Sequence, residues 1–167
     1  LSFRIAEAQK EILLDNGPKD FSLYISIPYC PSRCSYCSFV SHAITGQKAR
    51  ALVPEYLDKL VKEIGFTAKI SRETGLRLRT IYIGGGTPTA LSAGQLKQVT
   101  DAVAVHFPLS DGVEYTIEAG RADTIDAEKL QVIREAGATR ISINPQTFED
   151  AVLKAIGRKH TGQQVID

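Results

Sequence analysis

The chain has 167 residues, of which 43% are hydrophobic, and it contains 13 glycines and no methionine. This size and composition fit one packed α/β domain or part of one. Lys and Arg number 20 against 19 Asp and Glu, so no basic field indicates binding to nucleic acid. No apolar run approaches the ~20 residues that span a bilayer, and no secretory signal is visible. We therefore expect a cytoplasmic protein without membrane insertion.

Short apolar runs predict four buried strands, because each is bounded by Pro, Gly or polar residues. The expected strands are 23–27, 80–83, 114–118 and 140–144. Residues 1–20 come before the first strand and are expected to be a lead-in, with a short helix through Ala6, Ile12, Leu13 and Leu14.

A helix is expected after each strand. The first starts with Pro54 in its first turn and continues to Ile64, and the second opens with a capping box, Ser92-x-x-Gln95. The third carries Leu130, Ile133 and Ala136 and stops at Gly137; the fourth is capped by Thr147-x-x-Asp150 and runs to Ile156. Four successive βα units predict parallel strands with right-handed crossovers. The pattern alone leaves a doubly wound sheet and a TIM-like barrel open.

The three cysteines of the chain, Cys30, Cys34 and Cys37, lie within eight residues at C-x3-C-x2-C spacing. Three thiolates can hold three irons of a [4Fe–4S] cluster and leave the fourth iron open to a small molecule. A disulfide framework fits poorly with an odd count. A zinc site would need a fourth ligand, which His42 could supply, and three buried core cysteines are a further alternative. The spacing favours the cluster.

Two further motifs follow predicted strands. Gly84-Gly85-Gly86 would let backbone approach a ligand and leave amide hydrogens free, although three glycines alone also make a plain tight turn. Glu118 ends an apolar strand, where a solvated carboxylate is the ordinary interpretation. In a barrel, the carboxyl ends of the strands form one face. The cysteine loop, the glycines, Glu118 and Gln146 would then meet there.

Five segments together resemble the radical S-adenosylmethionine (SAM) enzymes, and within them the oxygen-independent coproporphyrinogen III oxidase group. They are S-L-Y-I-S-I-P-Y-C (22–30) with the cysteine loop, I-Y-I-G-G-G-T-P-T (81–89), T-I-E-A-G (116–120), R-I-S-I-N-P-Q-T-F (140–148) and L-K-A-I-G-R-K-H (153–160). The resemblance implies a partial TIM-like barrel of six βα units. This chain would hold about the first four, so that residues 21–167 form the N-terminal part of a truncated core domain.

The resemblance also implies the cofactors and their ligands. A [4Fe–4S] cluster would be held by Cys30, Cys34 and Cys37, and one or two SAM molecules would bind beside it. The SAM contacts carried over from the family are Tyr24, Tyr36, Gly84, Gly85, Gly86, Thr87 and Glu118, with Gln146 and Arg158 for a second SAM. An electron donor such as flavodoxin or ferredoxin would reduce the cluster, and SAM would yield a 5′-deoxyadenosyl radical. The implied substrate is a porphyrinogen, and the implied reaction is oxidative decarboxylation of coproporphyrinogen III in haem biosynthesis.

Two departures from the family leave the substrate open. Ser38-Phe39 stands where the oxidases have Gly-Cys, and Gly120-Arg121 stands where the haem-chaperone branch commonly has Asn-Pro. The combination is most similar to the coproporphyrinogen dehydrogenase variant. A haem chaperone on the same scaffold and a radical SAM methyltransferase are the alternatives.

Overall fold

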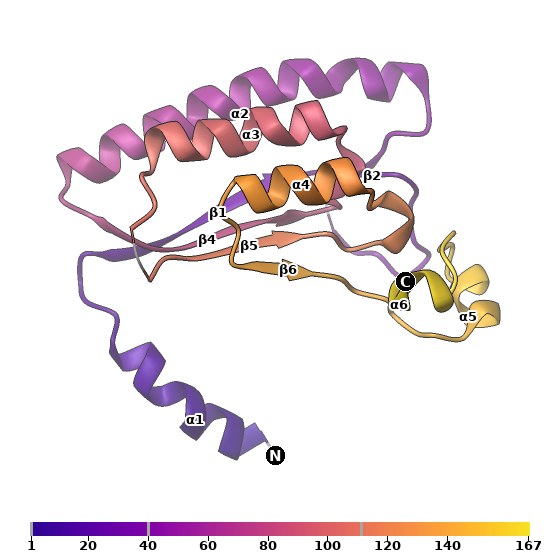
Figure 1. Cartoon of the computed structure of the whole chain (residues 1–167), viewed down its shortest axis with the longest axis horizontal. Helices are drawn as coiled ribbons and strands as arrows, with labels where there is room; N and C mark the ends of the chain where they lie inside the picture. Colours follow the sequence, from indigo (N-terminus) through magenta and orange to yellow (C-terminus); the bar gives the residue numbers. More distant parts are fainter. Residues whose placement is uncertain (1, 40, 111) are drawn as a thin grey trace.

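A four-stranded parallel sheet forms the centre of the molecule (Figure 1). The computed structural model describes residues 2–39, 41–110 and 112–167, with only the backbone of residues 11–13. The strands lie side by side in chain order: β1 (Asp20–Ile27), β4 (Arg77–Gly85), β5 (Glu114–Glu118) and β6 (Arg140–Ser142). All three pairings are parallel. The four predicted strands are therefore confirmed, with β1 and β4 longer and β6 shorter than expected.

The three helices that connect the strands lie on the same face of this sheet (Figure 1). They are α2 (Gln47–Glu73), α3 (Ala93–His106) and α4 (Ala127–Glu135), one in each crossover. A doubly wound sheet would reverse its strand order and carry helices on both faces. Sequential strands with helices on one face instead match the wall of a TIM-like barrel, so the barrel interpretation is confirmed.

The core fills the space between the sheet and these helices. It is formed by alternate strand residues and by the inner helix faces: Ile25, Ile27, Ile81, Ile83, Tyr115, Ile117, Leu57, Leu60, Ile64, Leu96, Val99 and Val103. Since successive side chains of a strand point to opposite faces, the other face of the sheet carries the residues between them. That face is polar and bears Tyr24, Tyr82, Thr116 and Glu118. In a closed barrel it would line the interior.

The remaining elements are short or peripheral. β2 (Tyr29–Cys30) and β3 (His42–Ala43) form a two-stranded parallel pair, and two 3₁₀ turns span Pro88–Ala90 (η1) and Ala122–Thr124 (η2). α5 (Asp150–Ala155) and α6 (Gln163–Ile166) lie near the carboxyl end of β6 (Figure 1). α1 (Ser2–Leu14) extends away from the sheet, as Figure 1 shows. This confirms the lead-in helix, although the side chains of Ile12 and Leu13 lie outside the described residues.

The helix ends agree with the sequence in two cases and differ in two. The Ser92–Gln95 capping box is present in both directions, and Gly137 has a φ of 78° just after α4. Pro54, however, lies inside α2 because the helix already begins at Gln47. Thr147 does not cap α5: its hydroxyl accepts a hydrogen bond from Glu149 N in a local turn, and the helix starts at Asp150. The Asp150 carboxylate accepts a hydrogen bond from the backbone amide of Gly162.

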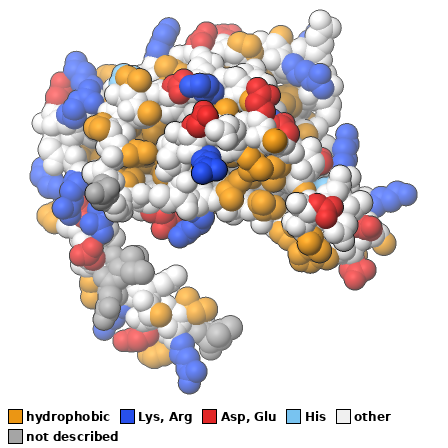
Figure 2. Space-filling view, viewed as in Figure 1, with side chains coloured by type: hydrophobic (Ala, Val, Ile, Leu, Met, Phe, Trp, Pro, Cys, Tyr) orange, Lys and Arg blue, Asp and Glu red, His pale blue; other side chains and the backbone are white. Residues whose placement is uncertain are grey.

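The surface mixes charge with apolar areas. Figure 2 shows hydrophobic side chains gathered toward the end of the molecule that carries α5 and α6. None of the helices in the described part of the chain is both long enough and apolar enough to cross a membrane.

Candidate functional site

The cysteine loop leaves the sheet directly after β1 and is closed at its base by the β2–β3 pair. His42 N donates to Pro28 O at 2.7 Å and Ile44 N donates to Cys30 O at 2.9 Å. These bonds fix both ends of the loop that contains Cys34 and Cys37. Cys30 and Cys34 are buried, whereas Cys37 is partly exposed. The three thiols are therefore presented at the carboxyl end of β1, as the sequence predicted.

The three cysteines line one cavity, but two of the sulfurs are engaged with protein groups. Cys30 Sγ lies 3.5 Å from Thr87 Oγ1, and Cys34 Sγ accepts a hydrogen bond of 2.9 Å from Arg121 Nη2. Within the described residues, no three His, Cys, Asp or Glu side chains converge on a point where a metal ion could sit. The proposed fourth zinc ligand, His42, has an exposed side chain that does not line this cavity.

The glycine turn packs directly under the cysteine loop. A Cβ on Gly86 would lie 2.6 Å from Tyr29 O and 2.9 Å from Cys30 Sγ, so only glycine fits there. Gly85 has a φ of 113°, which side-chain-bearing residues rarely adopt. The expectation of free amide hydrogens in this turn is wrong for Gly86, and the next amide, that of Thr87, is also bonded. Gly86 N donates to Ile27 O and Thr87 N donates to Tyr29 O, because this turn continues the backbone pairing beyond β1.

Glu118 is held at the end of β5 by a tyrosine. Tyr82 Oη donates to Glu118 Oε1 at 2.5 Å, and this hydrogen bond raises the pKa of Tyr82 to about 12. Gly84 makes room for the pair, since a Cβ there would lie 2.7 Å from the Tyr82 ring and 3.0 Å from Glu118 Oε2. The Glu118 carboxylate faces the cavity and has a defined partner, unlike a freely solvated strand-end carboxylate.

Tyr24 lies beside the cavity rather than in it. It is opposite Tyr82 in the sheet, and the two rings stack with centroids 5.9 Å apart and an interplanar angle of 14°. Its side chain is 59% exposed on the polar face of the sheet. Tyr24 thus reaches the site through Tyr82 and Glu118.

Arg158 joins the last part of the chain to the cysteine loop. Its Nη2 donates to Tyr36 Oη at 2.9 Å and its Nη1 donates to Gly120 O at 3.1 Å, while Nε is buried and has no hydrogen-bond partner among the described residues. Burial raises the pKa of Tyr36, and the hydrogen bond from Arg158 acts in the opposite direction. Gln146 lines the same cavity and has a positive φ of 68°.

One cavity of roughly 300 Å³ thus collects most of the predicted site residues. Those that line it are Cys30, Cys34, Tyr36, Cys37, Gly85, Gly86, Thr87, Glu118, Gln146 and Arg158, whereas Tyr24 and Gly84 do not. It lies at the carboxyl ends of β1, β4, β5 and β6, where barrel enzymes carry their sites.

Sequence reasoning missed two residues of this site, Tyr82 and Arg121. Tyr82 was visible in principle, since strand alternation places it on the same face as Gly84 and Glu118. Arg121 followed Glu118 by three residues and was noted only as a departure from the family. No local pattern indicated that it would be buried against Cys34.

Residues 24–167 match the family model of the radical SAM superfamily. The chain belongs to this superfamily. Its members use a [4Fe–4S] cluster and SAM. The residues that line the cavity fit a cluster and SAM. Three thiols from one loop share the cavity with a turn that has no room for a Cβ at Gly86. The buried Nε of Arg158, which has no hydrogen-bond partner among the described residues, lies at the same cavity. Cys30, Cys34 and Cys37 are the residues that would hold the cluster.

The relatives of this radical SAM chain carry different names, and two of them illustrate this. An "oxygen-independent coproporphyrinogen-III oxidase-like protein HemZ" of Bacillus subtilis is 42% identical over 89% of the chain and 29% of its own length. A "heme chaperone HemW" of the same organism is 44% identical over 86% of the chain and 36% of its length. The chain spans about a third of the length of these curated relatives.

A solved structure of a radical SAM enzyme is similar to this chain. The coproporphyrinogen III oxidase HemN of Escherichia coli, described as a radical SAM enzyme, matches with a TM-score of 0.76 and 26% identity, covering 95% of this chain and 35% of its own. The radical SAM chain therefore has the fold of the HemN-like group.

Proposed function

We propose that this chain is the cluster- and SAM-binding part of an oxidoreductase that decarboxylates coproporphyrinogen III in haem biosynthesis. The observation that carries this proposal is the single cavity shared by the three cysteines, the glycine turn, Glu118 and Arg158. Bound there, the cluster and SAM would supply a 5′-deoxyadenosyl radical able to remove a hydrogen atom from a propionate side chain. That side chain would then lose carbon dioxide and become a vinyl group.

Different residues of the chain would bind the cluster and SAM. Cys30, Cys34 and Cys37 would hold three irons, and Gly85–Thr87 form the wall next to Cys30. Glu118, which Tyr82 orients, would accept hydrogen bonds from the hydroxyl groups of SAM.

A second SAM would bind toward Tyr36, Gln146 and Arg158. The unpartnered Nε of Arg158 and the guanidinium's preference for carboxylates support this assignment. Arg158 would hold the carboxylate of the second SAM, with Tyr36 fixing the orientation of the guanidinium.

Two further parts of the proposal concern the whole protein. Residues 21–167 form the first four βα units of a core whose other units complete the barrel, which agrees with relatives about three times as long. The reductant would be an electron carrier such as flavodoxin or ferredoxin.

A haem chaperone is the second candidate. It is favoured by the 44% identity to a protein named as one, and by the absence of the Gly-Cys pair that follows the third cysteine in the oxidases. It would use the same cluster-binding cavity without decarboxylating a porphyrinogen.

Anaerobic assays of the full-length protein separate the two. The purified protein should contain about four irons and four acid-labile sulfides, and after reduction with dithionite it should cleave SAM to 5′-deoxyadenosine and methionine. With coproporphyrinogen III it should form protoporphyrinogen IX, which is oxidised to the porphyrin and identified by chromatography. Cys37→Ala is the control that removes the cluster and should abolish both reactions.

Stoichiometric zinc without sulfide would contradict the cluster assignment itself. A loaded cluster with SAM cleavage, no decarboxylated product and haem binding that survives gel filtration would establish the chaperone in place of the oxidase.

A further inference from the structure

Arg121 is a buried arginine at the end of the cluster cavity. It lies three residues after Glu118, immediately before η2, and it is 3% exposed. Its backbone carbonyl accepts hydrogen bonds from Thr124 N and Thr124 Oγ1, at 3.1 and 2.8 Å. The short turn thus fixes the backbone from which the side chain reaches the cysteine loop.

Both terminal nitrogens of the guanidinium bind that loop. Nη1 donates to Ser32 Oγ at 2.7 Å, and Nη2 donates both to Ser32 O at 2.8 Å and to Cys34 Sγ at 2.9 Å. The fork geometry of arginine makes these contacts possible, whereas lysine carries a single ammonium group on a flexible stem. Arg121 therefore contacts Cys34 directly.

The charge of Arg121 has no carboxylate to balance it. Among the residues that the structure describes, none places a carboxylate oxygen within 4.0 Å of this guanidinium. Burying an unpaired charge is costly unless an opposite charge or strong hydrogen bonds compensate it. The one contacted atom that can become an anion is Cys34 Sγ, since iron binds the thiolate form of cysteine.

Resting on the proposed cluster assignment, we propose that Arg121 is a positioning residue that pairs with the Cys34 thiolate and raises the reduction potential of the cluster. A hydrogen bond to a cluster sulfur withdraws electron density from it, and a nearby positive charge favours the more negative, reduced state. Reduction of the cluster by the external donor becomes easier, and the orientation of Cys34 is fixed.

The test compares Arg121→Gln with wild type in the anaerobically reconstituted full-length holoenzyme. The readout is the midpoint potential, from a redox titration followed by electron paramagnetic resonance of the reduced cluster. In Arg121→Gln the ratio of reduced to oxidised cluster at a fixed potential should fall about tenfold, which is a shift of ~59 mV to more negative values for a one-electron couple. Arg121→Lys keeps the charge and should shift the potential by less.

Two controls isolate the contact with Cys34. Ser32→Ala removes the hydroxyl partner of Arg121 but leaves the Cys34 contact, and Arg33→Gln removes an exposed arginine that donates to Cys37 O at 3.5 Å. Ser32→Ala should keep the wild-type potential, and Arg33→Gln, which removes an exposed charge that solvent screens, should shift it by less than Arg121→Gln. A shift in Arg33→Gln equal to that in Arg121→Gln, or no shift in Arg121→Gln, would overturn the proposal.

The test also distinguishes this proposal from the assignment of the cluster. If wild type itself fails to load iron and sulfide, the proposed function is wrong. If wild type and Ser32→Ala load the cluster while Arg121→Gln and Arg121→Lys fold by circular dichroism but do not load it, Arg121 is a scaffold for the loop and the proposal of a raised potential falls.

Discussion

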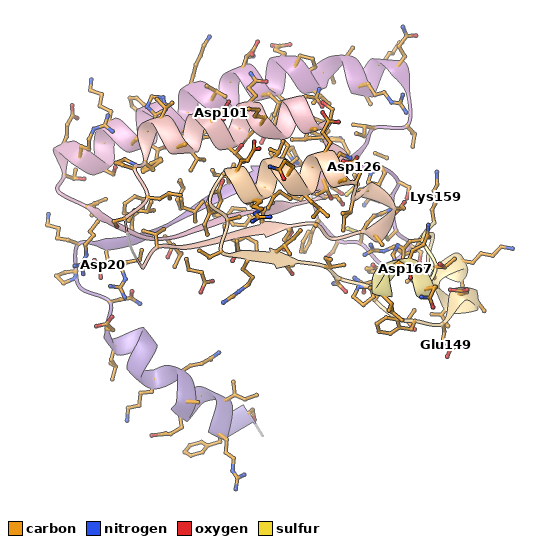
Figure 3. All side chains as sticks on the ribbon, viewed as in Figure 1. Asp20, Asp101, Asp126, Glu149, Lys159 and Asp167 are labelled. Atoms are coloured by element: carbon orange, nitrogen blue, oxygen red, sulfur yellow. The ribbon has the colours of Figure 1, made fainter. Side chains whose placement is uncertain are left out.

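The two ends of the parallel sheet differ in how their arginine side chains are paired. Figure 3 labels Asp20 at one end and Glu149 and Lys159 at the other. At the amino end, Asp20 receives two hydrogen bonds from Arg77, and Arg79 binds Asp15 at 2.7 Å. At the carboxyl end, Arg121 is buried without a carboxylate, and Arg158 keeps an unpartnered Nε. In the part of the chain that the structure describes, Arg77 and Arg79 thus have carboxylate partners, whereas Arg121 and Arg158 have none.

Backbone conformation differs between the two ends at one residue. Gln146, at the carboxyl end, is the non-glycine residue with a positive φ among those that the structure describes, whereas glycines with a positive φ lie at both ends. Strained or unsatisfied groups persist where surrounding structure or a ligand compensates them, and they concentrate at functional sites. The amino end thus serves stability, while the carboxyl end is arranged for groups that the chain itself does not contain.

The strongest test of this contrast is Gly86→Ala. The new Cβ would meet backbone at Tyr29 and the sulfur of Cys30, so the cysteine loop would have to move. We expect loss of most of the iron and sulfide after reconstitution, and a destabilisation of about 1–3 kcal/mol from overpacking. Gly94→Ala is the matched control, since nothing lies within 4 Å of its Cβ position at the start of α3. It should load normally; equal loss of iron in the two variants would contradict the close approach.

A smaller effect is expected from Glu118→Ala. Loss of a charged hydrogen-bond acceptor is worth about 1.5–3 kcal/mol, so SAM affinity should fall roughly 10- to 100-fold with the cluster intact. Tyr82→Phe removes only the phenol that orients Glu118 and should weaken SAM binding by less. Equilibrium binding of SAM to the oxidised holoprotein measures both. Unchanged affinity in Glu118→Ala would return Glu118 to the role of a strand-end carboxylate.

Arg158→Lys should have a still smaller and more selective effect. A lysine cannot reproduce the contacts of the guanidinium with Gly120 and Tyr36 or form two parallel hydrogen bonds to a carboxylate. Conversion of coproporphyrinogen III should fall roughly fivefold, corresponding to about 1 kcal/mol for one hydrogen bond, with less change in substrate-free SAM cleavage. Tyr36→Phe controls for the phenol contact. Equal loss of both reactions in Arg158→Lys would argue against a second SAM.

Features set by neighbouring residues in sequence could be predicted. The Ser92–Gln95 capping box and the stop at Gly137 depend on local hydrogen bonds and on the φ of one residue, and both are present. The convergence of Cys30, Gly86 and Glu118 followed from the rule that parallel strands present their carboxyl ends at one face.

Two local features were predicted wrongly because competing local signals decided them. Good helix-forming residues from Gln47 onward place Pro54 inside α2, and a local turn displaced Thr147 as a cap. Features decided by tertiary contacts could not be predicted. The amide of Gly86 was expected to be free, but the carbonyl of Ile27 at the end of β1 accepts its hydrogen. The position of Arg121 against Cys34 depends on a contact 87 residues apart in sequence.

The smallest effect is expected at the amino end, from Asp20→Asn. The hydrogen bonds from Arg77, followed by the amide of Gly17, lower the pKa of Asp20 to about 2 from an ordinary value of 3.8. A lowered folded-state pKa means that the ionised carboxylate stabilises the fold above about pH 3.8, and that this stabilisation is lost as the pH falls toward 2. Thermal unfolding followed by circular dichroism should therefore show a lower Tm for Asp20→Asn at neutral pH, and a difference from wild type that disappears near pH 2.

Asp101→Asn, which breaks an exposed ion pair with Lys97 in α3, is the control and should change the Tm little at any pH. Iron loading should be normal in both variants, because neither residue approaches the cavity. A loss of cluster in Asp20→Asn would show that the two ends of the sheet are coupled, and the division between a stabilising end and a functional end would have to be abandoned.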